Sequence, residues 1–330
     1  MDQPELPASK RVAENTDVLE VIFEHLGLTR LPTLKCVCTS WWALAREMRA
    51  RWATATIAGQ VNPELILGGL DAPYAVRLPD DGGLAVTDAA NACILLFSPS
   101  DLDGTGAAFR IIGCRGASPG DLKKPKGLAT DGTHLFVADS DNHRVQQLRI
   151  SDGRSVDSIG KQGFGHGHLL FPEGLALVRG SEHDGSNGAL PSDRELAVGN
   201  IDRLYVADCY NNRICVFGVS PLRYLTSIGK RGSAPLEFNF PKGVAVHAGY
   251  LYVADCENQR VQVLTFGGGF VRSFRLDYLP ASIAVRPDGR FLIRRGTRSY
   301  ATRSCVELRT LHGSLLQVRL AKYTLGTAYS

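Results

Sequence analysis

Residues 15–53 carry a helical spacing of apolar positions. One set recurs at intervals of three and four residues and so lies on one face of a helix: Val18, Leu19, Ile22, Phe23 and Leu26. Two further short helices are predicted, one beginning near Thr29 and one near Ser40. Three short helices bury little apolar surface, so such a unit is marginal alone and needs a neighbour or partner to pack against.

From residue 54 onward the pattern changes to short β-strands that repeat. A segment ending in Val-Ala-Asp occurs at 135–139, 204–208 and 251–255, and weaker copies occur at 84–88 and 291–295. One apolar strand precedes each copy and two follow it, so the repeating unit is four short strands. Four strands in about 40–50 residues is the pattern of a β-propeller blade. The sequence therefore predicts a mainly β protein with five complete four-strand blades.

Three parts of the chain fall outside these blades. Residues 54–66 and 320–330 could close the ring or supply parts of a sixth, composite blade. The stretch 179–203, rich in Gly, Ser and Asp, interrupts the third repeat and is predicted to be a mobile surface loop. Residues 1–14 precede the helical pattern and are predicted to be a disordered N-terminal tail.

Composition agrees with a soluble globular chain of short strands and tight turns. Hydrophobic residues make up 44% and charged residues 21% of the chain, and 35 of its 330 residues are glycine. No apolar stretch approaches the ~18 residues that a membrane span needs, and the first residues lack the apolar core of a signal peptide. We therefore expect a cytoplasmic or nuclear protein with no membrane contact, whose eight cysteines are free and mostly buried.

The repeats resemble the NHL family of β-propellers. The resemblance rests on the opening PKGLA at 125–129 followed by LFVADSDNHR at 135–144. The segments 172–176 and 241–245 carry the same opening, and a Ser-Ile-Gly turn recurs at 158–160 and 227–229. The resemblance covers about residues 60–320 and implies a propeller, commonly of six blades.

The helical segment 15–53 resembles an F-box. The matching residues are Asp17-Val18-Leu19, Ile22-Phe23, Leu26, Leu31, Val37-Cys38, Trp41, Leu44-Ala45 and Trp52. The usual Leu-Pro opening is replaced by Asn15-Thr16. The resemblance implies that an apolar face docks on a Skp-type adaptor of a cullin-RING ubiquitin ligase, and the residues expected to do so are Leu19, Ile22, Phe23, Leu26, Leu31, Val37 and Trp41. Packing of this face on the propeller is the alternative interpretation.

Basic residues gather in the loops that lead into the blades and in the last fifth of the chain. The net charge is +4, but residues 270–330 hold 11 basic and three acidic residues. We expect the leading loops to share one face with the turns after the second strands, and a basic face there attracts RNA, phosphate or an acidic peptide. A solvated rim of salt-bridged side chains would need no ligand. The candidate target- or RNA-binding residues are Lys123, Lys124, Lys126, Lys161, Lys230, Arg231, Lys242, Arg294, Arg295, Arg298, Tyr300 and Arg303.

A turn of the form Asp-x-x-Asn-x-Arg follows the second strand at 139–144, 208–213 and 255–260. A feature present in several blades is typical of architecture, with Asp and Arg pairing inside the blade and Asn favouring the turn. His166 and His168 lack an obvious third ligand, so they predict no metal site. Neither a catalytic motif nor a phosphate loop occurs, and we expect no cofactor and no catalysis.

Three functional hypotheses follow. The first is a target-receptor subunit of an SCF-type cullin-RING ubiquitin ligase, in which the F-box binds the adaptor, the propeller binds an unknown target protein, and the chain is monomeric outside the complex. The second is an RNA-binding NHL propeller that acts through its basic face. The third is a metal-dependent propeller lyase or hydrolase, which some propellers of this type are.

Overall fold

A computed structural model describes residues 74–78, 83–98, 110–180, 201–285, 289–296, 305–309 and 315–320. Within these ranges the chain forms five antiparallel sheets of four strands each. In chain order the sheets consist of β1 (Ala75–Arg77), β2 (Leu84–Asp88), β3 (Cys93–Phe97) and β4 (Arg110–Ile112); β5 (Pro125–Thr130), β6 (His134–Asp139), β7 (Arg144–Arg149) and β8 (Ser155–Ile159); β9 (Pro172–Val178), β10 (Arg203–Asp208), β11 (Arg213–Val219) and β12 (Leu222–Ile228); β15 (Pro241–His247), β16 (Tyr250–Asp255), β17 (Arg260–Thr265) and β18 (Phe270–Arg275); and β19 (Pro280–Val285), β20 (Phe291–Arg295), β21 (Cys305–Arg309) and β22 (Leu315–Leu320).

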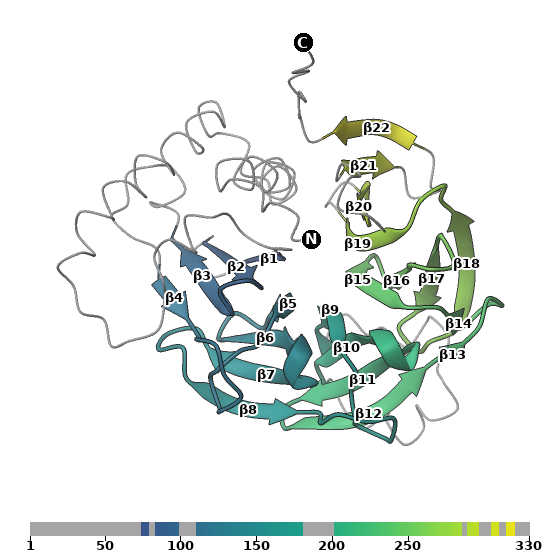
Figure 1. The fold of residues 1–330 in the computed structure, drawn as a ribbon. Coiled ribbons are helices and arrows are strands. Elements are labelled where there is room, and N and C mark those ends of the chain that lie inside the picture. The colour runs from purple at the N-terminus through teal and green to yellow at the C-terminus, as the bar shows by residue number, and fades with distance from the viewer. Residues whose placement is uncertain are drawn as a thin grey trace, which may run out of the picture.

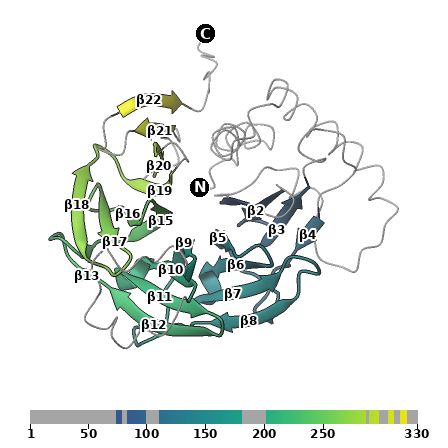
Figure 2. The same ribbon diagram turned by 180° about the vertical axis from the view of Figure 1, so that it is seen from behind.

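The five sheets are the blades of a β-propeller. Neighbouring strands in each sheet are consecutive in the sequence, so each blade is a simple meander. The blades stand side by side around a common axis, with the first strand of each nearest the axis and the fourth outermost (Figures 1 and 2). The first strands of successive blades contact one another. The predicted mainly β fold of five four-strand units is therefore confirmed in the described part of the chain.

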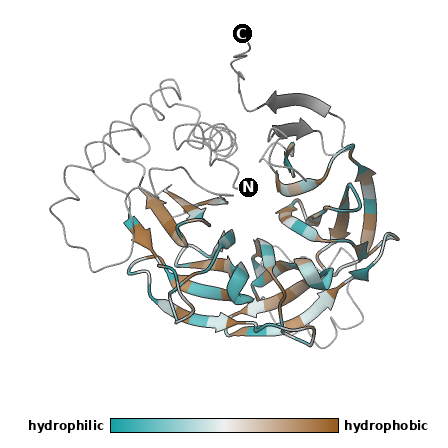
Figure 3. Cartoon of the chain, viewed as in Figure 1, coloured by the Kyte–Doolittle hydropathy of each residue, from teal (hydrophilic) through white to brown (hydrophobic). Residues whose placement is uncertain are grey.

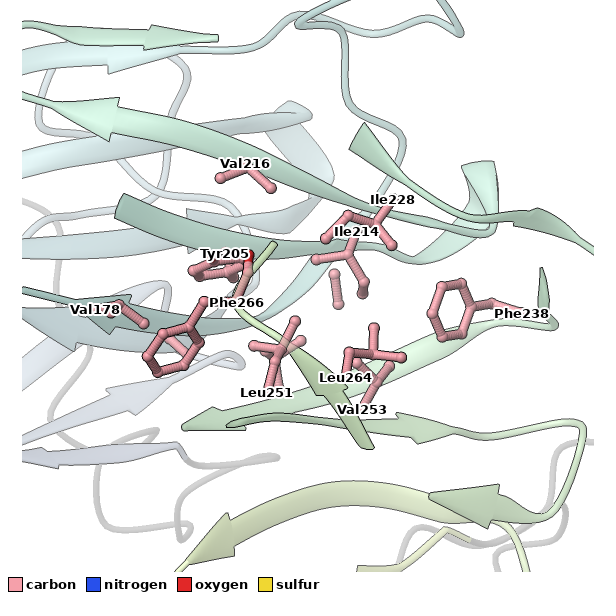
Figure 4. Close-up of a cluster of buried hydrophobic side chains, with 13 residues drawn as sticks. Val178, Tyr205, Ile214, Val216, Ile228, Phe238, Leu251, Val253, Leu264 and Phe266 are labelled. Carbon is pink, nitrogen blue, oxygen red and sulfur yellow. Dashed lines mark hydrogen bonds between the residues drawn. The ribbon is translucent and has the colours of Figure 1, made fainter. Parts of the chain in front are cut away.

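The core lies between blades rather than within them. Because side chains alternate across a strand, each middle strand contributes apolar residues to both of its neighbours. Between the third and fourth blades, Tyr205 and Ile214 pack against Val253 and Leu264, with the Phe238 ring beside them (Figure 4). The outermost strands β8 and β12 are more exposed than the strands β7 and β11 inside them. Figure 3 shows hydrophobic and hydrophilic positions interspersed along the blades. Each blade is consequently stabilised by its neighbours.

In each of the three blades that match the repeat pattern well, a buried aspartate ends the second strand and accepts several hydrogen bonds. In the fourth blade, the Asp255 carboxylate accepts hydrogen bonds from Asn258 Nδ2 at 2.9 Å, Arg260 Nε at 2.7 Å and Gln262 Nε2 at 3.1 Å. It also accepts one from the backbone N–H of Asn239 at 2.7 Å. The equivalent groups are Asp139 with Asn142, Arg144 and Gln146, and Asp208 with Asn211, Arg213 and Cys215. The architectural interpretation of the Asp-x-x-Asn-x-Arg turn is confirmed.

The arginine of this group fastens the leading loop to the same blade. The Arg260 guanidinium donates to the carbonyls of Ser233 at 2.7 Å, Ala234 at 2.9 Å and Glu237 at 2.7 Å. Arg144 and Arg213 do the same with the loops before their own blades. Leading loops and second-strand turns therefore lie on one face, as the sequence predicts, and we call it the turn face.

The first and fifth blades depart from this arrangement. Asp88 bonds the backbone and side chain of Asn91, but Cys93 stands where the other blades have arginine. In the fifth blade Arg295 occupies the aspartate position, and its guanidinium lies over the Tyr278 ring, 5.0 Å from the centroid. The arginine-bonded carboxylate is thus a property of the three middle blades.

Several predicted features lie outside the described residues. These are the tail 1–14, the F-box-like segment 15–53, the possible blade remnants 54–66 and 321–330, and residues 181–200 of the insert. In the part of the chain that the structure does describe, no helix is long and apolar enough to cross a membrane.

We call the bonds of the turn arginine to the buried aspartate and to the leading loop the arginine lock, and Arg260→Met tests it. The substitution leaves Asp255 buried beside an apolar side chain, and breaking a buried ion pair costs about 3–5 kcal/mol. We expect the midpoint of urea unfolding to fall accordingly. Lys230→Met is the matched control, because it removes an exposed ion pair with Glu237 (3.5 Å) on the same loop and should leave the midpoint unchanged. Equal shifts in both variants would contradict the lock.

Candidate ligand-binding face

A row of four aromatic rings crosses the turn face. The ring centroids are 4.5 Å apart for His143 and Phe171, 4.7 Å for Phe171 and Tyr210, and 5.0 Å for Tyr210 and Phe240. The side chain of Tyr210 is 50% exposed. We call these four residues the aromatic row. It joins the second, third and fourth blades and offers solvent a continuous apolar strip.

Hydrogen bonds between blades hold the row in place. Phe171 and Phe240 each precede the proline that opens a blade, and both have left-handed backbones with φ of 51°. The N–H of Phe171 donates to His143 Nδ1 at 3.2 Å, and that of Phe240 donates to Asn212 Oδ1 at 2.9 Å. Burial lowers the pKa of His143, so the neutral ring that must accept this bond is the favoured form near pH 7. Left-handed non-glycine residues are uncommon and concentrate at functional sites.

Five of the basic residues predicted from the sequence are exposed in the leading loops of the turn face. Lys124 is 3.3 Å from Asp141, and Lys230 is 3.5 Å from Glu237. Lys123, Lys161 and Arg231 are exposed and form no ion pair with any described residue. The turn face therefore carries uncompensated positive charge beside an apolar strip.

The remaining basic candidates lie elsewhere. Arg294 and Arg295 are half-buried on β20 rather than on an open loop. Arg298, Tyr300 and Arg303 lie outside the described residues, as do the adaptor-binding candidates between Leu19 and Trp41.

Lys126, Glu173 and Lys242 come together near the propeller axis. Each is the middle residue of a Pro-x-Gly opening on β5, β9 or β15, the strands nearest the axis. A Cβ atom on Gly127 would lie 2.3 Å from the Glu173 carbonyl oxygen, and one on Gly174 would lie 2.4 Å from that of Lys242. Only glycine permits this approach, which brings three charged side chains together.

Of the three charged side chains near the axis, Lys126 and Glu173 form an ion pair with each other. Lys126 Nζ lies 2.6 Å from Glu173 Oε1, and the Glu173 side chain is only 8% exposed. Burial opposes the charged form of Lys242, but Glu173 together with Cys256 and Cys209 favours that form, and the pKa of Lys242 lies above its usual value. Burial is also the main cause that raises the pKa of Cys256 to about 11 and the pKa of Cys209 further still. The thiols are therefore protonated and unreactive near neutral pH.

The two histidines of the third leading loop do not form a metal centre with described residues. His166 Nδ1 lies 3.4 Å from the Tyr224 hydroxyl. No group of three or more histidine, cysteine, aspartate or glutamate side chains suited to a metal occurs within the described ranges. The described part of the turn face carries charged groups, aromatic surface and hydrogen-bond donors, which are groups suited to binding.

Comparisons with known proteins agree with this architecture. The NHL repeat family matches residues 122–148 and 238–264, so the chain carries NHL repeats. Protein brain tumor of Drosophila melanogaster is 24% identical over 161 residues, which is 48% of this chain and 13% of that protein. A chain of the nidogen–laminin complex superposes with a TM-score of 0.50 at 15% identity, covering 75% of this chain and 80% of that one. The chain is thus a β-propeller that carries NHL repeats, and it spans 13% of the length of its curated relative.

The sequence analysis missed the aromatic row and the role of Glu173. A signal for Glu173 was present, because it occupies the same Pro-x-Gly position as Lys126 and Lys242. Phe171 and Phe240 likewise both precede a blade-opening proline. Their contact through Tyr210 joins residues about 30–40 positions apart, which no local pattern reveals.

Gly174→Ala tests the close approach of the Gly174 backbone to the Lys242 carbonyl near the axis. The added Cβ would clash with backbone, and overpacking of this kind costs about 1–3 kcal/mol. Gly218→Ala is the matched control, because its Cβ would have no neighbour nearer than 3.6 Å. We expect only Gly174→Ala to lower the free energy of unfolding in urea, and a loss of the same size in Gly218→Ala would contradict the geometry.

Proposed function

We propose that this protein is a non-catalytic receptor that holds a target protein on the turn face of its propeller. The observation that carries the proposal is the solvent-open aromatic row, which spans three blades beside uncompensated cations. Aromatic side chains flanked by positive charge are typical of the centres of protein interfaces. The charge favours a target segment that is acidic, because complementary charge speeds encounter and rejects basic partners.

The second half of the proposal concerns the segment 15–53. Its resemblance to an F-box supports docking on a Skp-type adaptor, which would make the chain a target receptor of a cullin-RING ubiquitin ligase. The chemistry of ubiquitin transfer would then belong to other subunits. This chain would contribute geometry, since it would hold the target near the loaded enzyme. No step in this role needs a metal, a cofactor or a nucleophile from the propeller.

The two halves are separable by substitution in the intact chain. Ile22→Asp places a charge on the proposed adaptor face and should abolish recovery of a Skp-type adaptor from a eukaryotic lysate. Tyr210→Ala removes the centre of the aromatic row and should reduce recovery of target proteins about tenfold or more. Each variant should leave the other partner's recovery unchanged, as measured by quantitative mass spectrometry.

Two controls accompany this measurement. Tyr210→Phe keeps the ring and should retain the targets, and Phe270→Ala removes a ring that is 37% exposed on the outer strand β18. Loss of targets in Phe270→Ala, or their retention in Tyr210→Ala, would rule out the turn face. An intact chain that recovers no adaptor, beside an F-box protein that does, would rule out the ligase role.

RNA is the second candidate ligand of the same face, and the unpaired Lys123, Lys161 and Arg231 favour it. Each phosphate contact contributes about −0.7 to the slope of log affinity against log salt for single strands. If RNA is the ligand, reversing all three charges to glutamate should flatten that slope by roughly two units. Fluorescence anisotropy with a labelled single strand measures it, and an unchanged slope would exclude this surface as an RNA site.

A further inference from the structure

His143 occupies the position in the second blade that Asn212 occupies in the third. Both residues end the short turn after the second strand, and both have a left-handed backbone with φ of 56°. Each side chain accepts a hydrogen bond from the N–H before the opening proline of the next blade. His143 Nδ1 accepts from Phe171 at 3.2 Å, and Asn212 Oδ1 accepts from Phe240 at 2.9 Å. The same bond is therefore made by an acceptor that titrates in one blade and by one that does not in the other.

Protonation removes the acceptor from His143. A neutral imidazole has one N–H and one acceptor nitrogen, whereas both nitrogens of the imidazolium carry a hydrogen. Rotation of the protonated ring therefore cannot restore the bond to the N–H of Phe171. The amide of Asn212 stays an acceptor at every pH at which the protein is folded. The bond between His143 and Phe171 consequently exists only while the ring is neutral.

The groups around His143 keep its ring neutral near pH 7. Burial is the largest cause that lowers the pKa of His143, and Lys123 of the leading loop acts in the same direction. Asp141 of the same turn and Asp208 of the third blade oppose them, but Asp141 is itself 3.3 Å from Lys124. The pKa of His143 thus lies below the ordinary histidine value of about 6.5.

Phe171 connects His143 to the rest of the aromatic row. Its ring centroid lies 4.5 Å from that of His143 and 4.7 Å from that of Tyr210. Its backbone is left-handed, a conformation that a bulky residue keeps only where its neighbours hold it. Protonation of His143 leaves the N–H of Phe171 facing a ring nitrogen that also carries a hydrogen. We therefore expect Phe171 to leave its place, while Asn212 keeps Phe240 beside Tyr210.

We propose that His143 is a proton-operated switch of the aromatic row. When its ring is neutral, Phe171 is fixed and the row is complete. When the ring is protonated, Phe171 is released and the row shortens to Tyr210 and Phe240. The consequence for binding rests on the proposed receptor function: the target is held at neutral pH and released at acid pH.

Amide hydrogen exchange of the full chain tests the switch without any target. Between about pH 7.5 and about pH 5, the protection of the Phe171 amide relative to its intrinsic exchange rate should fall at least about fivefold. The Phe240 amide is the internal control, because its acceptor on Asn212 does not titrate, and its protection should change less than about twofold.

His143→Asn separates this histidine from every other titrating group. It gives the second blade the acceptor of the third, in a left-handed backbone that asparagine tolerates. The variant should keep the Phe171 amide protected over the whole pH range. His166→Asn is the matched control, because His166 is an exposed histidine of the same face and its loss should leave the response of Phe171 unchanged.

Unfolding in urea supplies a second measurement. Because the pKa of His143 is lower in the folded chain, the stability that its neutral ring contributes is present above about pH 6.5 and is lost as the pH falls through the folded-state pKa. The urea midpoint should therefore fall further on acidification in the unsubstituted chain than in His143→Asn.

Three results would overturn the switch. They are constant protection of Phe171 in the unsubstituted chain, an equal fall of that protection in His143→Asn, and an equal fall at Phe171 and Phe240. None of them bears on the receptor function, which the recovery of targets by Tyr210→Ala tests separately. If His143→Asn does not fold, the comparison of Phe171 with Phe240 in the unsubstituted chain decides.

Discussion

The buried aspartate at the end of the second strand is the interaction on which the rest of this propeller depends. Its carboxylate is fully buried in the three middle blades, where leaving it unpaired would be strongly destabilising. The turn's asparagine and arginine and a backbone N–H of the leading loop together satisfy it. One side chain therefore fixes both the turn and the loop in front of it. The two components of the turn face are therefore held together by one shared acceptor.

The turn face carries charged side chains near the propeller axis and aromatic side chains further from it. Near the axis, the Pro-x-Gly openings approach one another closely and pair Lys126 with Glu173. Further from the axis, the left-handed residues before those prolines present Phe171 and Phe240 to Tyr210. The residue before each opening proline and the residue after it thus supply the aromatic and the charged side chains.

Much of this could be predicted from sequence, because repetition amplifies weak local signals. Five copies of one strand pattern identify the blades, and three copies of Asp-x-x-Asn-x-Arg identify the lock. The functional details could not be predicted in the same way. Whether a lysine is free or paired depends on its neighbour in the next blade, as Lys126 with Glu173 shows. The fifth blade departs from the repeat, so the place of Arg295 over Tyr278 had no template in the others.

We propose that partners meet the turn face at the aromatic row. The most direct test is site-specific photo-crosslinking, with a photoreactive phenylalanine analogue at position 210 or, separately, at position 271 on the outer strand, where Val271 is 42% exposed. In a cell lysate, we expect discrete crosslinked partners from position 210 and none of these from position 271. The same partners from position 271, or none from position 210, would contradict it.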